Sequence, residues 1–136
     1  MTPISKPVNV LLVEYQTLTR VGIRTVLSPT GDIDVIGEAD DPAKGFRLFR
    51  ELHPDVTILG LRFPDHCTID DLDNYFVTTP KAKVIVLADH AGDAEITRAL
   101  KKGASGYICK DIEPDELAKA IRTVNSGRKY IPPDIA

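Results

Sequence analysis

The sequence predicts an α/β fold with a five-stranded parallel sheet and helices on both of its faces, a doubly wound (βα)5 arrangement. Short, almost continuously apolar runs recur along the 136 residues, and segments with helical spacing of apolar residues lie between them. Continuous apolar runs are typical of parallel strands that are buried on both faces. Strand and helix alternate five times, which favours one open sheet covered by its own crossover helices.

Five apolar runs are the expected strands. They are Val8–Val13, Asp34–Gly37, Val56–Leu59, Val84–Leu87 and Tyr107–Cys109. In an open parallel sheet the carboxyl ends of the strands share one edge, and ligands bind there, where the strand order reverses. The residues expected at that edge are Glu14, Tyr15, Gly60, Ala88, Asp89 and Lys110.

Apolar stripes of helical period mark the expected helices between these strands. The clear stripes lie within Leu18–Leu27, Gly45–Leu52, Ile96–Leu100 and Leu117–Val124. Gly103 follows the third of these as a typical helix stop. The segment Ile69–Thr79 is the weakest candidate, because Asp71, Asp73 and Asn74 are poor residues for the middle of a helix.

Composition excludes several classes of protein. The net charge of −3 argues against attraction of the whole surface to nucleic acid. No apolar run approaches the roughly 18 residues that a membrane span needs, and Met1–Pro7 lacks the apolar stretch of a secretion signal. The two cysteines form no CxxC pattern, so a reduced, cytoplasmic protein is expected.

Motifs for cofactors, metals and catalysis are missing from the strand ends. Glu14–Arg20 contains no Gly-rich nucleotide loop, so no cofactor is expected. His53, His66 and His90 share no metal-ligand spacing and are interpreted as loop residues. No nucleophile–base pair is visible at the strand ends, which argues against an enzyme.

Three stretches, taken in order, resemble a known family. Val10–Glu14, Pro54–Pro64 and Gly103–Asp111 are similar to the receiver domain of two-component response regulators. Gly37–Asp41 and Ser126–Pro133 are similar to its NarL/FixJ (LuxR-type) subgroup. The resemblance covers about residues 8 to 136 and implies the flavodoxin-like receiver fold.

The chemistry of that family needs groups that this sequence mostly lacks. An aspartate at the end of the third strand accepts a phosphoryl group, two acidic residues after the first strand help hold Mg²⁺, and a hydroxyl residue and a lysine end the fourth and fifth strands. The resemblance places Gly60 at the acceptor position, Glu14 and Tyr15 at the acidic pair, and Ala88 at the hydroxyl position. Only Lys110 is retained.

A degenerate phosphorylation pocket with no catalytic residue and no bound metal is therefore expected. The family's aromatic switch position is Tyr107. Because the phosphoacceptor and the hydroxyl residue are both missing, we expect the domain to have one dominant conformation. An ion pair between Glu14 and Lys110, about 4 Å or less in length, is expected to hold it partly in place. Glu14 alone is a poor site for Mg²⁺. Asp89 belongs to a different loop and is not expected to replace the acceptor.

The resemblance implies an atypical, phosphorylation-independent receiver domain over residues 1–127. Residues 128–136 would begin a linker to a helix-turn-helix DNA-binding domain, and only that missing part would contact DNA. Such a protein would regulate transcription through dimerisation or partner binding. A sensor kinase or another protein is an expected partner, and a weak homodimer would use Leu18–Leu27 or Pro114–Asn125.

Two other functions are compatible with the same residues. The emptied pocket around Gly60 and Ala88 could accept a small molecule, a reading that a pocket filled by Tyr15 would weaken. The chain could also be a stand-alone protein-interaction module with no output domain.

Overall fold

A parallel sheet forms the centre of the molecule in the computed structural model, which describes residues 6–90 and 94–132. Its strands follow the order β2-β1-β3-β6-β7. They are β1 (Val8–Val13), β2 (Ile33–Ala39), β3 (Val56–Gly60), β6 (Val84–Ala88) and β7 (Gly106–Cys109). All four pairings between neighbouring strands are parallel. The predicted fold class is confirmed.

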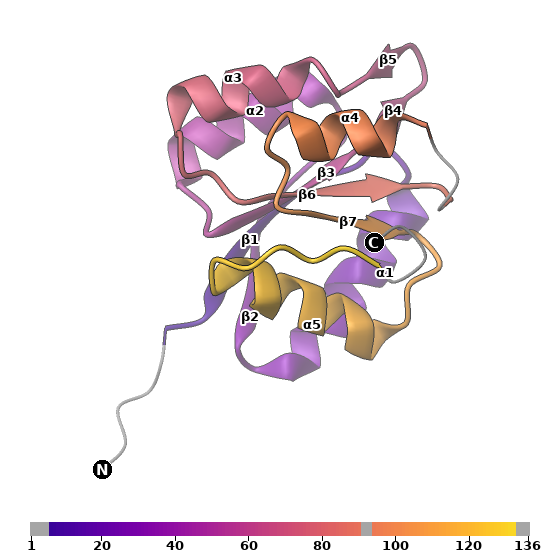
Figure 1. The fold of residues 1–136 in the computed structure, drawn as a ribbon. Helices are drawn as coiled ribbons and strands as arrows, with labels where there is room; N and C mark the ends of the chain where they lie inside the picture. Colours follow the sequence, from indigo (N-terminus) through magenta and orange to yellow (C-terminus); the bar gives the residue numbers. More distant parts are fainter. Residues whose placement is uncertain (1–5, 91–93, 133–136) are drawn as a thin grey trace.

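Helices cover both faces of this sheet (Figure 1). They are α1 (Thr17–Leu27), α2 (Pro42–Leu52), α3 (Asp71–Thr78), α4 (Glu95–Lys101) and α5 (Pro114–Asn125), with a short 3-10 turn at Ser28–Thr30. The weakly predicted segment Ile69–Thr79 does contain a helix, α3. None of the helices in the described ranges has the length and apolar character needed to cross a membrane.

The sheet separates two apolar layers because successive strand residues face opposite sides. On one face, Phe49 of α2 and Tyr75 of α3 pack ring against ring with centroids 4.6 Å apart. On the other face, Ile23 of α1 and Ile121 of α5 join the second apolar layer. Together these layers leave β1, β3, β6 and β7 almost fully buried, whereas the edge strand β2 stays partly exposed.

A small antiparallel hairpin follows β3 and was not predicted. It consists of β4 (Arg62–Phe63) and β5 (His66–Cys67). The expectation that His66 is a loop residue was therefore wrong: His66 lies in β5, and its Nε2 atom is 2.9 Å from Asp71 in the first turn of α3. Strands of two residues are too short to show a periodic pattern, so they could not be predicted.

The chain after α5 turns back along the sheet. Tyr130 forms an isolated parallel bridge with Gly106 of β7, so the segment expected to begin a linker starts in contact with the domain. Residues 133–136 of that expected linker lie outside the described residues. The division between a receiver at 1–127 and a linker at 128–136 stays a prediction.

Candidate functional site

The carboxyl ends of four strands bring the predicted site residues together. Val13 of β1 pairs with Leu59 of β3, and Gly60 pairs with Leu87 of β6. At the next pairing, the Lys110 N–H donates to the Ala88 carbonyl at 3.0 Å. This register places the residues that follow β1, β3 and β7 around one site, as expected for a parallel sheet.

The predicted contact between Glu14 and Lys110 is confirmed. The Lys110 Nζ atom lies 3.1 Å from Glu14 Oε2, well within the usual ion-pair limit. The same carboxylate oxygen accepts a hydrogen bond from the Gln16 N–H at 3.0 Å. The Glu14 side chain is fully buried, whereas that of Lys110 keeps 15% of its surface exposed. The pair is therefore much less open to water than a surface ion pair.

Lys110 has further partners that were not predicted. Its ammonium lies 2.8 Å from Asp89 Oδ1 and donates to Gln16 Oε1 at 2.6 Å. It also lies 5.5 Å from the centre of the Tyr15 ring, a cation–π distance. Burial by itself lowers the pKa of Lys110, but the hydrogen bonds and charges of Asp89 and Glu14 outweigh it and raise that pKa above its ordinary value. Lys110 is thus held as a cation.

The Glu14 carboxylate occupies the space above Gly60. A Cβ atom added at residue 60 would lie 2.8 Å from Glu14 Oε1, closer than real Cβ atoms approach other groups, and 3.2 Å from the Val13 carbonyl oxygen. Among the described residues, Glu14 Oε1 has no hydrogen-bond partner. The Gly60 backbone is fixed in turn, because the buried Thr68 hydroxyl donates to the Gly60 carbonyl at 2.7 Å. A side chain at position 60 therefore requires the Glu14 carboxylate to move from its present position.

The Tyr15 side chain contacts both Phe63 and Lys110. Its half-buried ring packs against Phe63 of β4 with centroids 5.7 Å apart, beside the Lys110 ammonium. Arg20 holds the backbone on either side of this point, donating to the carbonyls of Glu14 at 2.7 Å and Tyr15 at 3.1 Å. The loop after β1 is therefore tied down, and Glu14 reaches into the pocket from a fixed base.

Ala88 and Tyr107 take less direct parts. Ala88 is buried and presents only a methyl group, so it offers no side-chain hydrogen bond. The Tyr107 side chain is fully buried in the core, and its hydroxyl accepts a bond from the Cys109 thiol at 3.5 Å. Within residues 6–90 and 94–132, no cluster of three His, Cys, Asp or Glu side chains is arranged to hold a metal ion.

Known proteins similar to this chain share its fold and much of its length. The profile of the response regulator receiver domain matches residues 10–122. The nitrate/nitrite response regulator protein NarL of Escherichia coli K12 is 31% identical over 126 residues, which are 93% of this chain and 58% of NarL. The transcriptional regulatory protein LnrK of Bacillus subtilis is 30% identical over 128 residues, 94% of this chain and 58% of LnrK. The chain thus spans less than two thirds of these relatives.

Solved structures agree with the sequence comparison. A LuxR-family two-component response regulator from Aurantimonas sp. SI85-9A1 superimposes with a TM-score of 0.88 at 30% identity, covering 96% of this chain and 93% of that one. The NarL signal receiver domain from Mycobacterium tuberculosis gives 0.82 at 30% identity, covering 91% and 100%. Response regulators are typically not enzymes, and receiver domains of this kind interact with sensor kinases and form dimers. This chain belongs to the response regulator receiver domain family, and its relatives are response regulators of the NarL and LuxR type.

Proposed function

We propose that this chain is an atypical receiver domain that works without phosphorylation at the end of β3 and regulates transcription through dimerisation or partner binding. The observation that carries the proposal is the buried Glu14 carboxylate, which fills the space above Gly60 and is bound by Lys110. A carboxylate belonging to the protein itself thus occupies the place where a phosphorylated side chain would have to stand.

The groups needed for phosphoryl transfer are missing or already engaged. Transfer needs a nucleophilic oxygen, and metal and lysine charges then stabilise the moving phosphoryl group. Gly60 has no side-chain oxygen, and Ala88 has no hydroxyl to bind a phosphoryl oxygen. The charge of Lys110 is already balanced by Glu14 and Asp89. These features support a domain that binds partners and carries out no chemistry, an assignment that goes beyond what the family alone establishes.

The test is incubation with a small phosphodonor and Mg²⁺, followed by intact-mass measurement. We expect no phosphoryl adduct in the pocket. A stable adduct that peptide mapping placed on a residue of this pocket would contradict the proposal.

A repair series provides the matched control. Gly60→Asp alone should not restore efficient, Mg²⁺-dependent phosphorylation, because Tyr15 and Ala88 still lack the metal carboxylate and the hydroxyl. Adding Tyr15→Asp and Ala88→Thr supplies those groups, but Glu14 still crowds residue 60. We therefore expect the largest gain in rate only when Glu14→Asp is added as well. A single Gly60→Asp variant as fast as the fullest repair would show that the pocket lacks something other than these groups.

The surface between α1 and α5 is the proposed site of self-association. A groove of about 230 Å³ lies there, lined by residues that include Gly22, Val26 and Leu117. Leu18 on its rim is 86% exposed, and the neighbouring Val21 is 38% exposed. Large exposed apolar side chains beside an apolar groove are typical of interaction sites. A second copy of the domain is the proposed occupant, with a sensor kinase or other protein as a further partner.

Sedimentation across a concentration series tests this surface. We expect a weak dimer that Leu18→Glu dissociates. Val77→Glu is the matched control, since Val77 on α3 is 82% exposed but lies on the other side of the sheet. Monomer alone at the highest concentration, or equal loss in both variants, would remove this part of the proposal.

DNA recognition is assigned to a part of the protein beyond the receiver. LnrK is by its name a transcriptional regulatory protein, and this chain spans only 58% of its length. We assign residues 1–127 to the receiver and residues 128–136 to the beginning of a linker to a helix-turn-helix domain. In a gel-shift assay at physiological salt, this chain alone should leave duplex DNA unshifted, consistent with its net charge of −3.

A further inference from the structure

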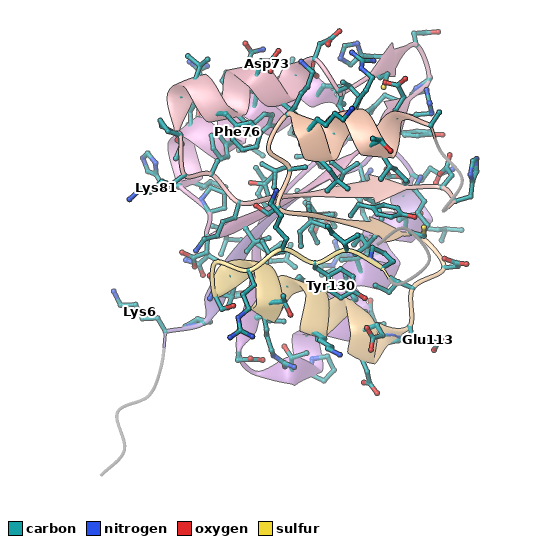
Figure 2. The ribbon with its side chains drawn as sticks, in the orientation of Figure 1. Lys6, Asp73, Phe76, Lys81, Glu113 and Tyr130 are labelled. Atoms are coloured by element: carbon teal, nitrogen blue, oxygen red, sulfur yellow. The ribbon has the colours of Figure 1, made fainter. Side chains whose placement is uncertain are left out.

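The segment 128–132 lies against the outer edge of β7. Figure 1 shows this yellow segment leaving α5 and running between α5 and β7, and Figure 2 shows Tyr130 on it. Because β7 is the last strand of the sheet, its outer edge would otherwise present unpaired backbone groups. The segment thus covers an edge that a sheet of this topology leaves open.

Tyr130 makes the backbone bonds that hold the segment to β7 and a side-chain bond to α5, and the Arg128 N–H adds one bond to the Thr123 carbonyl of α5 at 3.2 Å. Its N–H donates to the Ser105 carbonyl at 3.0 Å, and its carbonyl accepts from the Tyr107 N–H at 3.1 Å. Its hydroxyl donates to Glu116 Oε2 of α5 at 2.9 Å. Burial, and then the bond to Glu116, raise the pKa of Tyr130 to about 12, so the hydroxyl keeps its proton at neutral pH. One residue therefore anchors the segment at three points.

Gly106 is what lets the segment come so close. A Cβ atom at residue 106 would lie 2.6 Å from the Tyr130 carbonyl oxygen and 3.3 Å from the Tyr130 backbone nitrogen. Backbone atoms cannot swing away as the end of a side chain can. Any larger residue at position 106 must therefore displace the segment itself.

Pro132 ends the pairing after a single bridge. Along a strand, every second residue points its N–H toward the same neighbour, so residue 132 would be the next to donate to β7 after Tyr130. Proline has no N–H to donate. The segment is thus paired with β7 through a single β-bridge. It also borders a groove of about 610 Å³, which leaves it partly open to solvent.

We propose that residues 128–132 form a releasable strap, which docks on β7 through Tyr130, fixes the direction in which the following chain leaves the domain, and opens without unfolding of the sheet. Release exposes the edge of β7 at Gly106 and Tyr107. This inference does not depend on the pocket chemistry, so the absence or presence of phosphorylation leaves it unchanged.

Native-state amide hydrogen exchange, read residue by residue by NMR, tests the strap. The Tyr130 N–H donates to the Ser105 carbonyl and the Tyr107 N–H donates to the Tyr130 carbonyl, so both hydrogen bonds break when the strap is released. The two amides should therefore show the same protection factor, intermediate between that of the sheet and that of an unstructured peptide. The N–H of Val86, in the central strand β6 between β3 and β7, should exchange only through global unfolding. Exchange of Tyr130 at the rate of Val86, with the same denaturant dependence, would show an integral strand. Exchange of Tyr130 at the rate of an unstructured peptide would show no docking. Either result overturns the proposal.

Variants in the strap itself give a second measurement that leaves the core intact. Tyr130→Ala should speed exchange of the Tyr107 N–H by about tenfold or more, the equivalent of about 1.4 kcal/mol, and leave Val86 unchanged. Lys129→Ala is the matched control, because Lys129 is an exposed neighbour on the same segment, and it should change neither amide. Gly106→Ala should reproduce the effect of Tyr130→Ala from the other side of the contact. An unchanged Tyr107 rate in Tyr130→Ala would refute the strap.

Discussion

Two groups of charged residues in this domain invite comparison, one around Lys110 and one between Asp32 and Arg122. The Arg122 guanidinium donates to both carboxylate oxygens of Asp32, at 2.7 and 2.8 Å. This two-pronged geometry is more favourable than the single-point contacts of the Lys110 ammonium. The Asp32 and Arg122 side chains are both about half exposed, however, whereas Glu14 is fully buried. Burial, more than hydrogen-bond geometry, therefore decides how much stability is lost when one partner is removed.

The physical reason lies in what remains after one partner is removed. An exposed carboxylate that loses its arginine is solvated at once, so the pair contributes about 0–1 kcal/mol. A buried carboxylate that loses its lysine stays out of water without a counter-charge, which costs about 3–5 kcal/mol.

Lys110→Met should have the largest effect. It leaves Glu14 buried and unpaired, so the free energy of unfolding in urea should fall by about 3–5 kcal/mol. The double variant Lys110→Met with Glu14→Gln should recover most of that loss, because the charge is then gone as well. Equal stability of the single and double variants would mean that water reaches Glu14 and that burial does not separate the two groups.

Gly60→Ala should have the next largest effect, because its Cβ meets Glu14 Oε1 at 2.8 Å. Overpacking of this kind costs about 1–3 kcal/mol in the free energy of unfolding. Gly22→Ala is the control, since a Cβ there meets nothing within 4 Å, and a helix interior gains about 0.5–1 kcal/mol from alanine. Thermal and urea unfolding should therefore move in opposite directions for the two variants.

Alkaline pH should weaken the Lys110 group selectively. The pKa of Lys110 is raised above 10.5 in the folded state, so its contribution is complete below the unfolded value of 10.5 and is lost as pH rises through the folded pKa. The stability difference between wild type and Lys110→Met should stay constant from neutral pH to about 10 and shrink above it. A difference that shrank on acidification instead would assign the effect to the carboxylates.

Asp32→Asn should have the smallest effect, about 0–1 kcal/mol, and salt should reduce it further. The bonds to Arg122 lower the pKa of Asp32 below 3.8, against a smaller opposing effect of burial. The contribution is therefore complete above pH 3.8 and is lost as pH falls through the folded pKa. Urea unfolding of wild type and variant between pH 2 and 7 gives the measurement, and a loss as large as that of Lys110→Met would void the comparison.

Most of the sheet could be predicted from the sequence, because its central strands are buried on both faces and leave a nearly continuous apolar signal. Val84–Leu87, for example, lies within β6 with no residue out of place. The contact between Glu14 and Lys110 could also be predicted, because the resemblance to receiver domains places both residues in one pocket. The hairpin of β4 and β5 could not, because two residues per strand carry no period.

The finer arrangement of the pocket depends on side-chain conformation, which periodicity does not report. The side chains of Asp89 and Gln16 both contact Lys110. The only indication of these contacts in the sequence is that Asp89 follows the end of β6 and Gln16 follows the end of β1. The placement of the Glu14 carboxylate above Gly60 depends on the length of one side chain. Pairing of Tyr130 with Gly106 joins residues 24 positions apart, and no local pattern encodes it.

The close contact between Glu14 and a side chain at residue 60 has a consequence for evolutionary history. Two substitutions that interfere sterically cannot be gained in either order with equal ease. A lineage that acquired a carboxylate at position 60 while position 14 was still glutamate would pass through a crowded, doubly charged intermediate. Shortening of residue 14 before that step avoids the crowding, so the order of the two substitutions affects how easily the pocket changes.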